Sequence, residues 1–280
     1  MIKIAATETY DPTLCVESWI NRVQGFDFVL YITKVLNPHI IKLLTDGESP
    51  ISYQNKASVI HLTCTGWGGT FLEPNVVSRE TFKDKTAQLI AAGYPKNRLV
   101  WRVDPIIPVK EGLERFKASV DLAISLGIYR IRASVMQLYK HSYERIKETP
   151  IIDEINSIYK GKFWPDKDAS WEFMVELLDI VQSFKEEHSD ISFEACASSM
   201  LHKCGFKDIS CMSEFDLNIN GFEPNSSWGM MHGTQRAGCS CLLKQQLIPG
   251  GFSRGRCPNK CLYCYLKDKE ETEVESEILF

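Results

Sequence analysis

Short apolar runs alternate with longer amphipathic stretches through most of the chain, and this alternation restricts the fold more than any other feature. It is typical of βα units, in which helices join parallel strands. The runs predicted as strands are 2–7, 27–33, 58–65, 98–108, 129–135 and 191–196. The stretches predicted as helices are 13–23, 38–44, 76–92, 111–127 and 170–188. We therefore expect an α/β fold built as a single TIM-like barrel, partial or full.

The distribution of cysteines divides the chain into two regions. Residues 1–195 hold the predicted βα units and form the barrel, whereas 196–280 is a cysteine-rich region that we expect to complete it. Of the 10 cysteines, those in the second region are Cys196, Cys204, Cys211, Cys239, Cys241, Cys257, Cys261 and Cys264. The N-terminus lacks the pattern of a signal peptide, so this many cysteines favours metal ligation over disulfides.

Charge and hydropathy indicate whether polyanions or membranes are expected as binding partners. The mild net charge of −4 gives no global signature of polyanion binding. No apolar run approaches the length needed to span a bilayer, so we expect no membrane association. Because no export signal is recognisable, we expect a cytoplasmic protein.

The sequence GRCPNKCLYCYLKD, near the end of the chain, has the spacing C-x3-C-x2-C at Cys257, Cys261 and Cys264. A loop this short can direct three thiolates at one centre. Four-iron clusters normally take four thiolates, so three leave one iron open to a small chelating molecule. A structural zinc loop is the alternative, although such sites prefer four protein ligands.

With an aromatic residue, Tyr263, before its last cysteine, this loop resembles the cluster loop of the radical S-adenosylmethionine (SAM) superfamily. The resemblance implies a [4Fe-4S] cluster, SAM bound to its open iron and oxygen-sensitive chemistry. SAM is then cleaved reductively to a 5′-deoxyadenosyl radical that abstracts hydrogen from a substrate. It also implies an electron donor such as flavodoxin or ferredoxin.

The position of the loop predicts the order of the strands. In the superfamily the loop follows the first strand, whereas here it follows QQLIPGG (245–251), which we interpret as the end of a strand. A barrel is a closed ring, so moving the chain break leaves the neighbours of each strand unchanged. We therefore expect a circularly permuted order, with the last strand beside 2–7.

Polar residues gather near the C-terminal ends of the predicted strands, where α/β barrels carry their chemistry. Arg102 and Asp104 are two apart in one strand, so they share a face, and an unpaired charge there would be costly. The residues expected to contact SAM are Thr65, Gly66, Gly68, Gly69, Arg102, Asp104, Ser134 and Glu194. Two alternatives remain open: a tight turn at the glycines and a structural Arg–Asp pair.

The cysteines outside the loop predict a second metal centre. Cys196, Cys211, Cys239 and Cys241 supply four thiolates, the number that a complete four-iron cluster takes. We predict an auxiliary [4Fe-4S] cluster on these four residues. Zinc, or small buried cysteines without any metal, are the alternatives.

Several segments together resemble one family. They are NRVQGFDFVLYITKVLNP, HLTCTGWGGTFLEPN, RLVWRVDPII, FEACA, SC, QRAGCSC and CPNKCLYCY. They are similar to the "domain of unknown function 1848" proteins, which carry a radical-SAM-like cysteine cluster at the C-terminus. That family tends to have Ser-Arg-Arg-Thr-Asp where this chain has AATETYD, so the identity of the substrate is not carried over.

Two classes of function follow from these features. WRVDPI is also similar to a strand of spore photoproduct lyase, a radical SAM enzyme that acts on DNA. This distant likeness suggests a nucleotide or nucleic-acid base as the substrate of a radical SAM enzyme. The alternative is an iron–sulfur protein for electron transfer or regulation that never cleaves SAM. Polar residues facing the barrel interior favour the enzyme, because an electron carrier needs no such lining.

Overall fold

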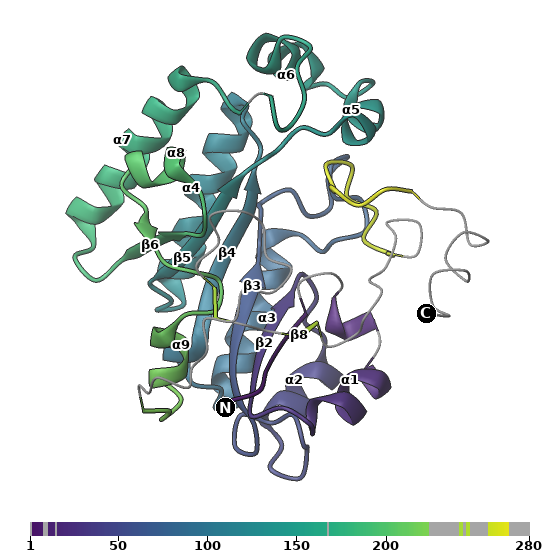
Figure 1. The fold of residues 1–280 in the computed structure, drawn as a ribbon, viewed down its shortest axis with the longest axis vertical. Helices are drawn as coiled ribbons and strands as arrows, with labels where there is room; N and C mark the ends of the chain where they lie inside the picture. The colour runs from purple at the N-terminus through teal and green to yellow at the C-terminus, as the bar shows by residue number, and fades with distance from the viewer. Residues whose placement is uncertain are drawn as a thin grey trace.

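The computed structural model describes residues 2–7, 11–14, 16–166, 168–223, 241–242, 245–246 and 257–268. In these ranges an eight-stranded sheet has the order β7-β6-β5-β4-β3-β2-β1-β8, and every neighbouring pair is parallel (Figure 1). The strands are β1 (Ile4–Ala6), β2 (Phe28–Thr33), β3 (Ala57–Thr63), β4 (Leu99–Ile106), β5 (Arg130–Val135), β6 (Ser192–Ala195), β7 (Lys207–Asp208) and β8 (Gln245–Gln246). The predicted α/β class with a parallel sheet is confirmed.

The five predicted helices are present, and local sequence explains where some of them begin. Asn37 accepts a hydrogen bond from the Ile40 N–H at 2.9 Å, and Pro38 occupies the first helical turn, where its missing N–H costs nothing. The helical segments are η1 (Pro12–Leu14), α1 (Val16–Val23), α2 (Pro38–Thr45), α3 (Arg79–Ala91), η2 (Lys96–Arg98), α4 (Lys110–Ser125), α5 (Lys140–Ile146), α6 (Ile152–Tyr159), α7 (Trp171–Glu187), α8 (Ser199–Lys203) and α9 (Glu214–Asn218).

The two faces of the sheet have different coverings. Val29 and Tyr31 of β2 belong to the main apolar core, which helices α1, α2, α3, α4 and α7 share. Leu30 and Ile32 of the same strand belong to a second apolar cluster on the opposite face, as the period of two in a strand requires. Both faces are buried, which accounts for the nearly continuous apolar runs of the sequence. We call the face opposite these helices the inner face.

The part of the chain that follows β6 covers the inner face. Met212 and Leu242 pack there against β1 and β2, and the Leu242 N–H donates to the Met212 carbonyl at 2.9 Å. Asn220 Oδ1 accepts from the Ser58 N–H of β3 at 3.1 Å. The cysteine-rich region therefore packs directly against strands from the first part of the chain.

The first and last strands along the described chain, β1 and β8, are neighbours in the sheet. β8 pairs in parallel with β1, with Ala5 beside Gln245 and Ala6 beside Gln246. The prediction that the strand before the cysteine loop lies beside 2–7 is thus correct. β7 and β8 are the two edges of the sheet, and no pairing joins them within the described ranges.

Short elements were the ones that the sequence did not predict. β7, α8 and α9 have five residues or fewer, too few for a hydrophobic period to be recognised. The irregular stretch 137–167 contains α5 and α6, each of eight residues or fewer. Among the described residues, no helix has both the length and the apolar character that crossing a membrane requires.

The aromatic core beneath β6 gives a first prediction, on stability. Phe193 is fully buried, and its ring centroid lies 5.4 Å from Phe206, 6.1 Å from Phe184 and 6.2 Å from Phe116. Phe193→Ala leaves a cavity between these rings, so the free energy of unfolding should fall by about 3–5 kcal/mol in a denaturant titration.

Val175→Ala is the matched control, because Val175 on α7 is 39% exposed. It should change the free energy of unfolding by no more than about 0.5 kcal/mol. Equal effects of the two substitutions would show that this aromatic group is not a stabilising core.

Candidate functional site

The cysteine loop, residues 257–268, lies at the end of the sheet to which the strands point (Figure 1). Two hydrogen bonds attach this loop to the segment after β3. The Leu262 N–H donates to the Leu72 carbonyl at 3.0 Å, and Asn75 Nδ2 donates to the Pro258 carbonyl at 2.6 Å. The loop therefore occupies the end of a parallel sheet where ligands usually bind.

Helix α5 holds the other side of the loop. Arg145 Nη2 donates to the Cys264 carbonyl at 2.5 Å, and His141 Nε2 lies 2.7 Å from the Tyr265 carbonyl. Apolar packing completes the attachment: the loop shares a buried cluster with Trp67, Leu72, Met136, Ile146, Ile155 and Tyr159. The short helices α5 and α6 therefore cover the loop.

A partly exposed lysine connects the loop to β2. Lys34 follows β2 directly, and its Nζ lies 2.5 Å from Glu73 Oε1 and 2.6 Å from Tyr263 Oη. Tyr263 also donates a hydrogen bond to Glu73, whose side chain is only 1% exposed. Burial acts to lower the pKa of Lys34, but the charges of Glu73, Cys261 and Asp104 raise it above its usual value. The amine therefore stays protonated, and its charge acts on both the loop and β4.

The three loop cysteines differ in exposure. Cys261 is buried, whereas Cys257 and Cys264 are half-buried. Burial, opposed by Lys34, raises the pKa of the Cys261 thiol to about 11. Among the described residues, the three cysteines whose sulfurs all lie within 4.8 Å of one another are Cys196, Cys211 and Cys241, and not those of the loop.

Arg102, Asp104 and Ser134 lie together at the C-terminal ends of β4 and β5. Arg102 Nη2 forms an ion pair with one oxygen of Asp104, and Ser134 Oγ donates to the other. The side chains of Arg102 and Asp104 are 20% and 24% exposed. The Arg–Asp pair left open by the sequence does form, and both of its members can still reach a ligand.

Glu194 has a different environment. Its two oxygens accept hydrogen bonds from Arg130 and Arg132, and its side chain is 2% exposed. Burial acts to raise the pKa of Glu194, but Arg132 and Arg130 outweigh it and hold that pKa below the usual value. Arg130 also bonds Asp216 at 2.8 Å, and Arg132 Nη1 lies 3.1 Å from His61 Nε2. In this structure Glu194 pairs with two arginines instead of facing an open site.

The glycine turn after β3 is explained largely by packing. Gly66 has a φ of +82°, and its carbonyl accepts from Arg115 Nη1 at 2.5 Å. A Cβ on Gly68 would lie 1.9 Å from the Val77 carbonyl oxygen, so no larger residue fits. The Gly69 N–H donates a hydrogen bond to the Glu73 carbonyl at 3.0 Å, so it is not available to a ligand. The tight turn left open by the sequence is therefore present.

Thr65 lies at the start of the same turn. It is buried, and its Oγ1 accepts a hydrogen bond from the Trp67 N–H at 3.3 Å. With Gly66, Gly68 and Glu73 it lines a small hollow beside α3.

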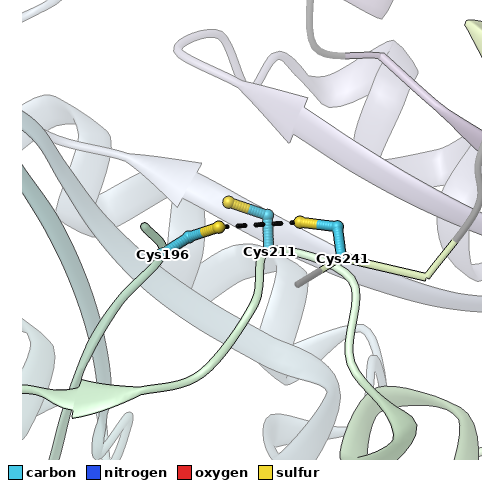
Figure 2. A group of neighbouring side chains, drawn as sticks. All are labelled: Cys196, Cys211 and Cys241. Carbon is cyan, nitrogen blue, oxygen red and sulfur yellow. Dashed lines mark hydrogen bonds between the residues drawn. The ribbon is translucent and has the colours of Figure 1, made fainter. Parts of the chain in front are cut away.

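A second group of cysteines meets on the inner face (Figure 2). The sulfurs of Cys196, Cys211 and Cys241 all lie within 4.8 Å of one another, and Cys196 Sγ is 3.7 Å from Cys241 Sγ. Hydrogen bonds with the other two thiols, together with burial, raise the pKa of Cys196 far above its usual value. Three of the four cysteines predicted for a second centre are thus together, and could bind a metal. Cys239 lies outside the described residues.

Lys34 and Glu73 are site residues that sequence reasoning missed. Lys34 stands directly after the apolar run of β2, at the end of a strand where chemistry is expected. Glu73 stands in the same segment as the glycine turn. The position of Lys34 at the C-terminal end of a predicted strand marks it as a candidate site residue. Its pairing with Glu73 and Tyr263 depends on the fold and cannot be read from the sequence.

Comparison with known proteins gives one match. The model of the family described as "Domain of unknown function (DUF1848)" matches residues 12–266, which is most of the chain. A search of curated proteins finds no match.

The Lys34 contacts predict how firmly the loop is held. Lys34→Met keeps the length of the side chain but removes the bonds of the ammonium to Glu73 and Tyr263. The Tyr263–Glu73 hydrogen bond remains, so the net loss should equal that of one charge-assisted bond, about 1.5–3 kcal/mol. Hydrogen exchange of amides in the loop, Leu262 above all, should accelerate by about 10- to 150-fold.

Lys56→Met is the control, since Lys56 Nζ bonds the Phe26 carbonyl at the opposite end of the sheet. It should leave exchange in the loop unchanged. Unchanged exchange in Lys34→Met as well would mean that Lys34 does not attach the loop.

Proposed function

We propose that this chain, which belongs to the family described as "Domain of unknown function (DUF1848)", is a radical SAM enzyme. It binds a [4Fe-4S] cluster on Cys257, Cys261 and Cys264, cleaves SAM reductively and abstracts hydrogen from a substrate. Flavodoxin or ferredoxin supplies the electron. The sheet order, with β8 beside β1, is the order expected of a permuted barrel.

One observation carries this proposal: the C-x3-C-x2-C loop lies at the C-terminal ends of the strands, next to partly exposed polar residues of the inner face. Lys34 connects the two, because its charge interacts with Cys261 on one side and Asp104 on the other. An iron–sulfur protein that only transfers electrons has no need for such residues beside its cluster.

The residues of the loop fit a cluster. Three thiols on one short segment match the three protein ligands that leave an iron open, and the positive charge of Lys34 opposes the negative charge of thiolates. The bound cluster would supply one electron and a chelation site for SAM. Trp67 and Tyr159 share a buried cluster with Cys261 and Tyr263 of the loop, which keeps water from this part of the site.

The SAM site that we propose is smaller than the sequence indicated. Arg102 can grip a carboxylate through two nitrogens, while Asp104 and Ser134 can bond hydroxyl groups. Glu194 is omitted because its side chain is only 2% exposed, whereas that of Asp104 is 24% exposed. The glycine turn contributes through its shape, since polar atoms of its backbone are bonded within the protein.

The substrate class to examine first is a nucleotide or nucleic-acid base. The support is the similarity of the WRVDPI strand to spore photoproduct lyase, which acts on DNA. Arg102 and Asp104 of this same strand border the proposed SAM site.

The reaction is tested by incubating the anaerobically reconstituted, reduced protein with SAM. We expect 5′-deoxyadenosine to form, and the electron paramagnetic resonance signal of the cluster to change when SAM is added. Cys257→Ala, Cys261→Ala and Cys264→Ala combined should abolish both, because the ligands of the cluster are gone.

Cys204→Ala is the control, since Cys204 is buried away from both groups of cysteines and bonds the Met174 carbonyl. It should retain product and signal. A reduced cluster that leaves SAM intact would support the electron-transfer function instead.

A second test concerns the SAM site. Arg102→Ala removes a charge-assisted bond, so SAM should bind more weakly by about 1.5–3 kcal/mol, or about 10- to 150-fold, in equilibrium titration. The iron content of the cluster should not change.

Glu194→Gln provides the contrast, because it leaves Arg130 and Arg132 buried with less counter-charge. It should lower the free energy of unfolding by about 3–5 kcal/mol, with little effect on SAM affinity while the protein is folded. Normal SAM binding by Arg102→Ala would place Arg102 outside the site.

A further inference from the structure

Three thiols from three separate segments meet on the inner face. Cys196 follows β6 directly, Cys211 stands shortly after β7, and Cys241 stands shortly before β8. Figure 2 shows the three sulfurs directed toward one another. Cys196 and Cys241 are buried, and apolar side chains of the inner-face cluster surround the group.

The separation of the sulfurs indicates what they can hold. Thiolates bound to one tetrahedral zinc ion, with Zn–S near 2.3 Å, lie about 3.8 Å apart. Cys196 Sγ and Cys241 Sγ are 3.7 Å apart, and all three sulfurs lie within 4.8 Å. In a four-iron cluster each thiolate binds a different iron, which keeps the sulfurs farther apart. This spacing fits a single ion better than the second cluster expected from the sequence.

The charge around the group also suits a metal thiolate. One zinc ion with three thiolates carries a net negative charge, which is costly to bury without a neighbouring cation. Arg132 Nη1 donates to the Cys211 carbonyl at 3.0 Å, and its charge interacts with Cys211. The three thiol protons would pass to solvent as the ion binds.

We propose that Cys196, Cys211 and Cys241 supply three of the four ligands of one zinc ion, which links the two edges of the sheet. Its ligands adjoin β6 and β7 at one edge and β8 at the other. The Leu242–Met212 hydrogen bond already joins the same two segments. This link holds β8 in place beside β1, and it does not depend on the function proposed for the loop.

The test uses the full chain with Cys257, Cys261 and Cys264 replaced by alanine, so that no metal is held by the loop. After purification from medium containing zinc and iron, elemental analysis should find about one zinc per chain. Adding Cys211→Ser should remove that zinc, whereas adding Cys204→Ser should not. Replacing zinc with cobalt should give the absorption bands of a tetrahedral cobalt–thiolate centre.

Two results would overturn the proposal. Iron and sulfide at about four atoms each per chain, lost with Cys211→Ser, would assign a four-iron cluster to these cysteines. If Cys196, Cys211 and Cys241 are intact and neither metal nor cobalt–thiolate absorption is found, these cysteines bind no metal ion.

A substitution in the triad can itself impair folding, so two further measurements are included. Cobalt absorption requires no change in the triad. Cys211→His replaces one zinc ligand with another and should recover zinc that Cys211→Ser loses. Stripping the ion with a chelator should lower the melting temperature of the protein, and added zinc should restore it.

Discussion

The parallel pairing of β8 with β1 is the interaction on which the rest of the structure depends. It brings the end of the chain back to its beginning, so that the cysteine loop is delivered to the same end of the sheet as Lys34 and Asp104. Hydrogen bonds with Leu72, Asn75 and Arg145 then fix the loop in this place. A strand pair of two residues thus contributes to which side chains lie beside the loop.

Regular elements could be predicted from the sequence because burial leaves a simple pattern. β2 is buried at every position, and its apolar run is unmistakable. The period of two also placed Arg102 and Asp104 on one face, as their ion pair requires. It could not identify the partners of Glu194, because those arginines lie on a neighbouring strand and only the register of β5 and β6 brings them together.

The same limit applies to the cysteines. Counting them suggested a second centre, but the spacing between their sulfurs depends on two segments that meet on the inner face through Met212 and Leu242. The Lys34–Glu73–Tyr263 contacts likewise join three distant parts of the chain. Long-range contacts of this kind leave no periodic trace in a sequence, whereas strands and amphipathic helices do.

The pairing of the first strand with the last also has a consequence in time. β1 (Ile4–Ala6) is apolar and buried, and its partner on one side, Gln245–Gln246, is synthesised much later than β1 itself. At ribosomal speeds this delay is on the order of tens of seconds. During that interval the nascent sheet keeps one apolar edge unpaired, and such edges can template pairing with other chains. Chaperone engagement of the nascent chain would therefore matter most before β8 emerges from the ribosome.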